Sequence, residues 1–227
     1  MTRELPPPAH GDWVKWDELS VKGDRNGHRV LLEGDTLRAA QAGYFGLIEH
    51  LDSQISPLVR EFKARSEKAG RPWVIVVTAD HGEMLGDHGY FRKCEPYEGS
   101  ANIPFIICGA PALREDRQMI REWLHFEHAP CYSQAQAYHT LTDGHIKYIW
   151  RPLDGTEELF DLDEDSKEEH DLSKRASRGT TLEAWRTRLV KRLANRPEGF
   201  SKDGKLVPGR PYRALNEGTF PSELKTS

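Results

Sequence analysis

The sequence has little cysteine and no long apolar run. Among its 227 residues there are three cysteines, Cys94, Cys108 and Cys131, and no two of them form a CxxC pair. No disulfide framework is therefore predicted, and a reducing compartment is the default expectation. No apolar stretch approaches the ~18 residues of a membrane-spanning helix. These two absences argue against both a disulfide-stapled secreted domain and a membrane protein.

An excess of positive charge is also absent. There are 32 Lys and Arg residues against 36 Asp and Glu residues, which gives a net charge of -4. A nucleic-acid binder that works through a broad positive potential is not predicted. The first residues, MTRELPPPAHGDW, contain no apolar segment typical of a signal peptide, so the cytoplasm is the default expectation. Three prolines without a preceding strand or helix are typical of the middle of a long loop, and any export signal would then lie upstream.

What remains is a globular composition with 37% apolar and 30% charged residues. Apolar residues recur at helical spacing from Asp35 to about Glu67, which predicts a helix with one buried face. The β-branched run at 73–78 and the run IPFIIC at 103–108 predict strands that are covered on both faces. Helix, strand, polar loop and strand in this order predict part of a doubly wound, mostly parallel α/β sheet.

The last 110 or so residues have a different pattern. Segments 144–151 and 158–162 predict two strands of an antiparallel hairpin, with a turn signal between them. Segment 118–126 fits either a strand or a short helix, a helix is predicted over 179–195, and the residues after it form an extended tail. The sequence therefore predicts an α/β part over residues 1–115 and a small α+β subdomain over residues 116–227.

The residues that carry chemistry follow the first predicted strand, in VIVVTADHGEMLGDHGYFRK. Asp80 and His81 come directly after the strand, where open α/β sheets place their ligands. One carboxylate and one imidazole suit a divalent metal, although a turn and a cap would use the same residues. Lys93 supplies a point cation for an oxygen of a sulfate or phosphate. His88 either lines this pocket or fixes the loop.

The segment TADHGEMLGDHGYFRKCEPYEGSANIPFIICGAP resembles the second metal-binding motif of the sulfatase family. That family lies in the alkaline phosphatase superfamily and includes arylsulfatases and phosphonate monoester hydrolases. The segments YFGLIEHLDSQI and DGHIKYIWRPLDGTEELFDLDEDSKEEHDLS resemble a helix and the closing hairpin of the same family. The resemblance covers roughly residues 1–195, so it implies an alkaline-phosphatase-like fold.

The resemblance also implies roles for particular residues. Asp80 and His81 match the metal ligands, and Lys93 matches the catalytic lysine that contacts the sulfate or phosphate group. Where the family more often has Asn, this chain has His81, as in the phosphonate and phosphodiester branch. Calcium or manganese is therefore the expected metal, with zinc less favoured. His88 and His128 are the expected further pocket residues.

The family's nucleophile is missing. It lies in a C/S-x-P-x-R motif, and the only approach to that motif, Cys94-Glu95-Pro96-Tyr97-Glu98, has Glu98 in place of Arg. The resemblance therefore implies the C-terminal portion of a hydrolase of small-molecule sulfate esters, inactive or very weak alone. The alternatives are a phosphate or phosphonate ester hydrolase, and a non-catalytic fragment or split subunit that needs an N-terminal half or a second copy.

Overall fold

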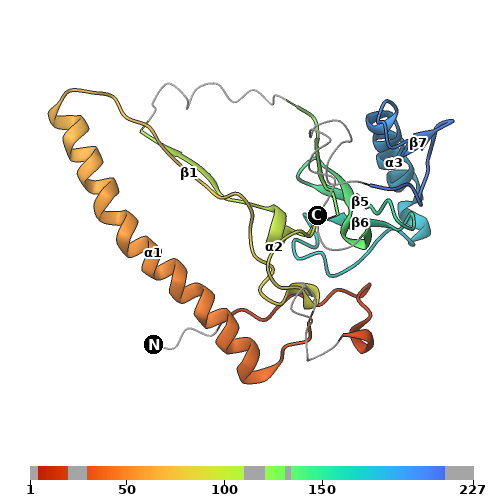
Figure 1. Cartoon of the computed structure of the whole chain (residues 1–227), viewed down its shortest axis with the longest axis horizontal. Coiled ribbons are helices and arrows are strands. Elements are labelled where there is room, and N and C mark those ends of the chain that lie inside the picture. The colour runs from red at the N-terminus through yellow and green to blue at the C-terminus, as the bar shows by residue number, and fades with distance from the viewer. Residues whose placement is uncertain (1–4, 20–29, 110–120, 131–133, 213–227) are drawn as a thin grey trace, which may run out of the picture. The chain divides into compact units, whose positions relative to one another are not determined.

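The computed structural model describes residues 5–19, 30–109, 121–130 and 134–212 (Figure 1). The chain divides into two compact units. Unit 1 comprises residues 1–93 and 97–120, and unit 2 comprises residues 94–96 and 121–227. The mixed α/β class is confirmed, while the predicted boundary at 115/116 lies outside the described residues. Within the described ranges, no helix is both long and apolar enough to cross a membrane.

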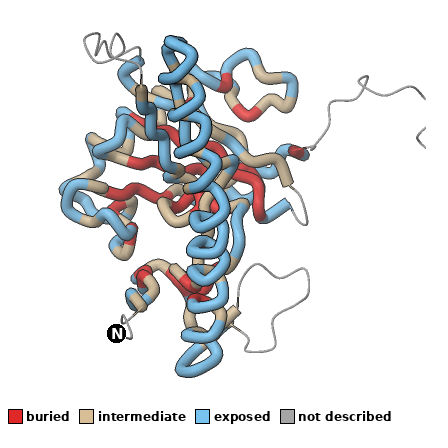
Figure 2. The backbone as a smooth tube through the Cα atoms, turned by 90° about the vertical axis from the view of Figure 1, so that its left-hand side faces the viewer, coloured by how far each residue is buried: buried red, intermediate tan, exposed pale blue. Residues whose placement is uncertain are grey.

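The long helix of unit 1, α1 (Gly34–Lys68), follows the predicted bounds. Asp35 in its first turn and Lys68 in its last turn both suit the helix dipole. The predicted burial of its apolar face is wrong within the described structure, because Leu47 and Leu58 are each 69% exposed. Figure 2 shows α1 exposed along almost its whole length. The periodicity identified the apolar face, but the described residues do not cover it.

The two strands of unit 1, β1 (Ile75–Thr78) and β2 (Phe105–Cys108), pair with each other. They run antiparallel, with Ile75 opposite Cys108, so the expected parallel arrangement is not what these strands form. The connection between the two strands, residues 79–104, contains the four-residue α-helix α2 (Glu98–Ala101) and not the longer helix that usually forms a parallel crossover. Burial on both faces is wrong as well, since all of β2 is exposed.

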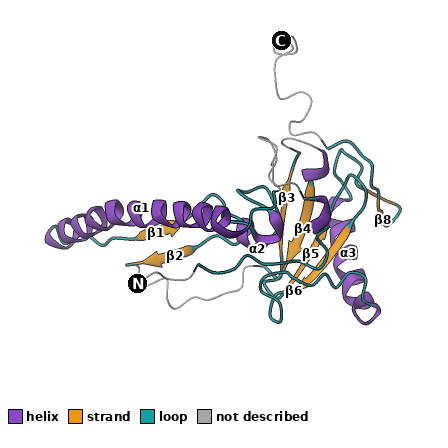
Figure 3. Ribbon diagram, turned by 90° about the horizontal axis from the view of Figure 1, so that it is seen from below, coloured by secondary structure: helices purple, strands orange, loops and turns teal. Residues whose placement is uncertain are grey.

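Unit 2 is built on a four-stranded antiparallel sheet (Figure 3). Its strands are β3 (Leu124–His128), β4 (Tyr138–Thr142), β5 (Ile146–Trp150) and β6 (Glu157–Asp161), and they pair in chain order. The predicted hairpin is confirmed as β5 and β6. Segment 118–126 contributes to a strand, although residues 118–120 lie outside the described ranges. Strand β4 was not predicted.

The core of unit 2 lies between this sheet and α3 (Gly179–Leu193), whose predicted bounds and apolar face are confirmed. Trp185, Leu189 and Leu193 are buried there, together with Tyr148 and Leu159 of the sheet. The residues after α3 were expected to form an extended tail, but the structure has a short hairpin at its start. That hairpin consists of β7 (Ser201–Lys202) and β8 (Lys205–Leu206), which contact α3.

A buried ion pair crosses the interior of unit 2. Lys147 on β5 and Glu168 are each 1% exposed, and the Lys147 Nζ lies 2.7 Å from the Glu168 Oε1. The same amine donates a hydrogen bond to the carbonyl oxygen of Pro96 at 3.0 Å. The segment Cys94–Pro96, which directly follows Lys93 in the chain, is therefore anchored to the sheet of unit 2.

Candidate functional site

Asp80 and His81 lie just beyond the end of β1, as the sequence predicted. The Nε2 of His81 is 3.3 Å from the Oδ2 of Asp80. The other carboxylate oxygen, Oδ1, accepts a hydrogen bond from the backbone N–H of His81 at 3.1 Å. The Asp80 side chain is 86% exposed and that of His81 is 38% exposed, so a hydrated ion can reach both.

The tautomer of the neutral His81 ring follows from the hydrogen-bond partner of its second nitrogen. Nδ1 lies 2.9 Å from the carbonyl oxygen of Gly82, and a carbonyl can only accept. Nδ1 therefore carries the proton in the neutral ring, and the lone pair of Nε2 faces the Asp80 carboxylate. Metal-ligating histidines are oriented by such a hydrogen bond on the opposite nitrogen. The pair fits a divalent cation as two of its ligands.

Two ligands do not complete a metal site. Among the described residues, neither Asp80 nor His81 belongs to a group of three or more convergent His, Cys, Asp or Glu side chains. Zinc generally takes four ligands and calcium six to eight. Further donors from water, substrate or other polypeptide would be needed.

The loop that follows His81 is held tightly. The N–H of Gly82 donates to the carbonyl of Ser100 at 2.8 Å, and a Cβ on Gly82 would lie 2.2 Å from the carbonyl oxygen of Gly99. Four non-glycine residues between β1 and β2, Leu85, His88, Arg92 and Cys94, have positive φ angles of 50°, 55°, 69° and 77°. Such conformations are sparsely populated and persist only where the surroundings enforce them, often at functional sites.

His88 is packed inside unit 1. Its side chain is 1% exposed, and Nδ1 accepts a hydrogen bond from the backbone N–H of Gly11 at 3.2 Å. The ring also contacts the rings of Trp13 and Tyr97. Of the two interpretations of His88, this placement supports the one in which it fixes the loop.

Lys93 and His128 are placed differently from His88. Lys93 is exposed, and within the described residues it makes no hydrogen bond or ion pair. His128 lies on β3 in unit 2, where its ring stacks on Tyr138 with the centroids 5.7 Å apart. Among the described residues of unit 1, no contact joins Lys93 to Asp80 or His81, and the predicted roles of Lys93 and His128 stay predictions.

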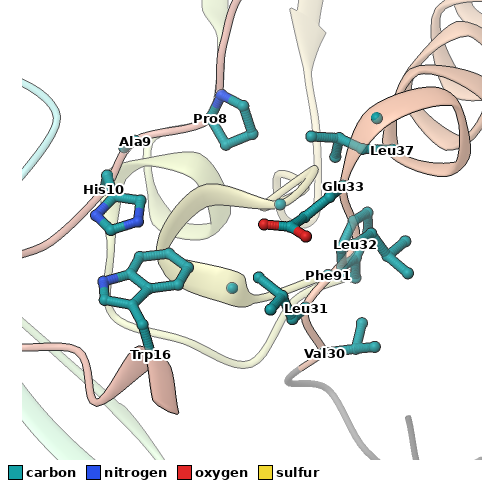
Figure 4. Close-up of a pocket in the computed structure, with 13 residues that line it drawn as sticks. Pro8, Ala9, His10, Trp16, Val30, Leu31, Leu32, Glu33, Leu37 and Phe91 are labelled. Carbon is teal, nitrogen blue, oxygen red and sulfur yellow. The ribbon is translucent and has the colours of Figure 1, made fainter. Parts of the chain in front are cut away.

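A cavity of about 240 Å³ in unit 1 lies elsewhere (Figure 4). Its walls are mostly apolar side chains such as Leu31, Leu37 and Phe91, and His10 and Glu33 supply polar groups. None of the predicted site residues lines it. The cavity is therefore not the pocket that the metal-ligand pair would serve.

A cluster in unit 2 was missed as a unit by reasoning from the sequence. His125, Glu127 and His139 bring one side-chain donor atom each to within 4.8 Å of one another. Burial lowers the pKa of His125 to about 4, and the hydrogen bond from His139 lowers the pKa of Glu127 to about 2. The His-x-Glu spacing was a signal in the sequence, but His139 joins it only through the pairing of β3 with the unpredicted β4.

Comparison with known proteins gives consistent results. The family model for "Sulfatase" matches residues 18–143. An arylsulfatase of Clostridium perfringens is 29% identical, with 93% of this chain and 52% of that protein covered. A phosphonate monoester hydrolase from Silicibacter pomeroyi has a similar structure, with a TM-score of 0.65 at 20% identity over 84% of this chain and 50% of that one. A structure described as a 2-O GAG sulfatase gives 0.63 at 18% identity, over 93% and 59%.

The structural neighbours confirm the alkaline-phosphatase-like sulfatase fold, and at these sequence identities they show the fold alone. This chain spans about half the length of the Clostridium perfringens arylsulfatase. The family model covers more than half of the chain and includes Asp80, His81, Lys93 and the whole loop between β1 and β2. The chain therefore belongs to the sulfatase family.

Proposed function

We propose that this chain supplies a metal-ligand pair and an anion-binding lysine to a hydrolase of small-molecule sulfuric esters, of the arylsulfatase type. The observation that carries the proposal is the 3.3 Å approach of the His81 Nε2 to the Asp80 Oδ2, with the other nitrogen of His81 tied to the Gly82 carbonyl. The family membership and the arylsulfatase relative support the sulfate ester as substrate.

Each residue has one task in this proposal. The Asp80 carboxylate and the His81 Nε2 hold a divalent cation, calcium or manganese, at the exit of β1. Such a cation would act as a Lewis acid toward the anionic oxygens of the ester. The Lys93 ammonium neutralises an oxygen of the group that is transferred, where charge grows during hydrolysis. The hydrogen bonds of Gly82 and Met84 keep the loop in place between these residues.

A phosphonate or phosphate ester is the second candidate substrate. The observation in its favour is His81, because the phosphonate and phosphodiester branch that this chain resembles has His where the family more often has Asn. A nitrogen ligand also suits manganese better than calcium, which prefers oxygen. The fold likeness to the phosphonate monoester hydrolase is compatible with both substrates. A comparison of turnover of an aryl sulfate and an aryl phosphonate separates the two candidates.

We also propose that the site is completed by further polypeptide that covers unit 1. The apolar residues Leu51, Val76 and Phe105 are 57%, 51% and 70% exposed, which is unfavourable in water. Among the described residues, β1 and β2 pair only with each other, so each leaves one edge able to receive another strand. The chain spans about half the length of the Clostridium perfringens arylsulfatase, and this favours an N-terminal sulfatase half over a second copy of the chain as the covering polypeptide.

Manganese binding tests the metal-ligand pair directly. The chain should bind Mn²⁺ weakly, and Asp80→Asn or His81→Ala should weaken this binding by about tenfold or more. Asp163→Asn is the matched control, because Asp163 forms an exposed Asp–His pair with His145 at 2.9 Å. Equal losses in the control and in Asp80→Asn would show that the binding is not specific to the loop.

Hydrolysis of p-nitrophenyl sulfate tests the rest. The chain alone should show no turnover with manganese or calcium. Co-expression with the half of the Clostridium perfringens arylsulfatase that this chain does not match should restore turnover, and Lys93→Ala should then lower it by about two orders of magnitude. Full turnover by the isolated chain would contradict the proposed need for a partner, and unchanged turnover in Lys93→Ala would contradict the role of the lysine.

A further inference from the structure

We propose that His125, Glu127 and His139 form a divalent-metal site within unit 2, with zinc as the favoured ion. The site needs no residue from unit 1 and does not depend on the proposed hydrolase function. The three residues share one face of the sheet, their donor atoms lie close to one another, and His139 is buried.

The strand register places the three side chains together. His125 and Glu127 are two residues apart on β3, so both point to the same face of the sheet. His139 on β4 is directly opposite Glu127 in the antiparallel register and therefore points to that face too. Three potential ligands thus come from two rigid neighbouring strands, which hold them more firmly than a loop would.

The donor atoms have the spacing of metal ligands. The His125 Nε2 lies 3.2 Å from the His139 Nδ1, which in turn lies 3.0 Å from the Glu127 Oε2. The third side of the triangle, from the His125 Nε2 to the Glu127 Oε2, is 3.7 Å. Two ligands that each lie about 2.0–2.1 Å from a tetrahedral zinc ion are about 3.3 Å from each other. The three separations lie on either side of this value.

The burial of His139 favours the same use. His139 is fully buried, and its Nε2 has no hydrogen-bond partner among the described residues, so its polar contacts are made through Nδ1. The His139 Nδ1 donates to Glu127 in the structure, so metal binding at this atom requires its proton to move to Nε2.

Two arginines and a tyrosine contact residues of the cluster and would affect metal binding there. The Arg192 Nε donates to the His125 Nδ1 at 3.2 Å, which leaves the proton of the neutral ring on Nε2. Metal binding at Nε2 requires this proton to move to Nδ1 and Arg192 to withdraw, which costs little because Arg192 is exposed. Arg196 donates to the Glu127 Oε1 at 3.0 Å, while Oε2 remains toward the histidines, and the Tyr212 ring stacks on His139.

The chemistry of the ligand set indicates the ion and its open position. Two imidazoles and one carboxylate are a common set for zinc that keeps a fourth position for water or a substrate group. The soft thiolates that copper(I) prefers are absent from this set, and calcium would want more oxygen donors. With Arg192 and Arg196 alongside, the fourth position would favour water or an anionic group.

Zinc titration of the full chain tests the proposal. The chain is stripped with a chelator and titrated against a chromophoric zinc competitor. We expect one tight equivalent that is weakened more than about tenfold by His125→Ala and by Glu127→Gln. Glu127→Gln keeps the shape of the side chain, and circular dichroism confirms that both variants fold. Arg192→Ala should instead tighten zinc binding, because it removes a nearby cation and frees the His125 ring.

Two control variants separate this site from others. His145→Gln removes an exposed histidine of the same unit, and Asp80→Asn removes the carboxylate of the pair in unit 1; neither should change the tight equivalent. Loss of that equivalent in Asp80→Asn alone would assign it to unit 1 and overturn the proposal. Zinc binding that is absent, or equal in all of these variants, would overturn it as well and leave the cluster as a hydrogen-bonded network.

Discussion

The two units place the same kinds of side chain in opposite surroundings. Leu51 and Leu58 on α1 are 57% and 69% exposed, whereas Leu189 and Leu193 on α3 are 0% and 1% exposed. Both helices carry regular apolar spacing. The difference shows that periodicity identifies which face of a helix is apolar, and that other elements decide whether this face is covered.

The strands repeat the contrast. Val76 and Val77 on β1 are about half exposed, while Tyr148 and Ile149 on β5 are fully buried. A two-stranded ribbon is marginally stable in water, but four strands that pack against a helix are enough for independent stability. We therefore expect unit 2 to be the part of the chain that holds its structure, and unit 1 to need cover.

The largest effect is expected at the buried ion pair of unit 2. Lys147→Ala removes the cation that lies 2.7 Å from the Glu168 carboxylate at a site with 1% exposure. Leaving a charge in the interior without its partner typically costs about 3–5 kcal/mol. Urea unfolding followed by tryptophan fluorescence should show this loss. A loss of unfolding free energy under about 1 kcal/mol would mean that the interior of unit 2 is more hydrated than the structure indicates.

A double replacement is the control for this loss. Lys147→Met with Glu168→Leu removes both charges and keeps side chains of similar volume. Because no buried charge is left, most of the lost stability should return. Failure to recover it would point to the hydrogen bond from Lys147 to the Pro96 carbonyl as the larger contribution.

The next effect comes from the core beneath α3. Leu189→Ala should lower the free energy of unfolding by about 2–5 kcal/mol, because it removes buried methyl groups and leaves a cavity among Trp185, Tyr148 and the other core residues. The same urea titration measures it. An effect below about 1 kcal/mol would contradict the close packing of unit 2 and weaken the contrast with unit 1.

Much of the local structure was predictable from the sequence. The bounds of α1 and α3 and the β5–β6 hairpin followed from strong periodicity and a clear turn signal. The direction in which β2 pairs with β1, and the exposure of α1, could not be predicted, because both depend on contacts far along the chain. Strand β4 was missed because its pattern, Tyr-His-Thr-Leu-Thr, is short and only weakly apolar, although the turn signal Asp143-Gly144 follows it.

The candidate sites divide in the same way. Asp80 and His81 are neighbours in sequence directly after a strand, so their pairing was predictable from position. Lys93 was predictable only as a residue type in a motif, and its role is still a prediction. The cluster of His125, Glu127 and His139 depends on the register between two strands, which a single sequence does not determine.

A smaller effect is expected at the surface of unit 2. The Asp163 carboxylate raises the pKa of His145 above its ordinary value, through a hydrogen bond and charge attraction. The stabilisation is therefore present below pH 6.5 and is lost as the pH rises through the folded pKa. In Asp163→Asn, NMR titration should find the pKa of His145 lowered toward 6.5. An unchanged pKa would show that this exposed pair is not formed in solution.

The smallest effect is expected on the exposed face of α1. Leu51→Ala removes a side chain that is 57% exposed, so little transfer energy is lost, and alanine is at least as good a helix former as leucine. The free energy of unfolding of the chain alone should change by no more than about 0.5 kcal/mol. In the complex with an N-terminal sulfatase half, the same substitution should weaken association by about tenfold or more, because Leu51 is then buried. A loss of 2 kcal/mol or more in the isolated chain would show that α1 is already covered there, and the contrast between the two units would no longer hold.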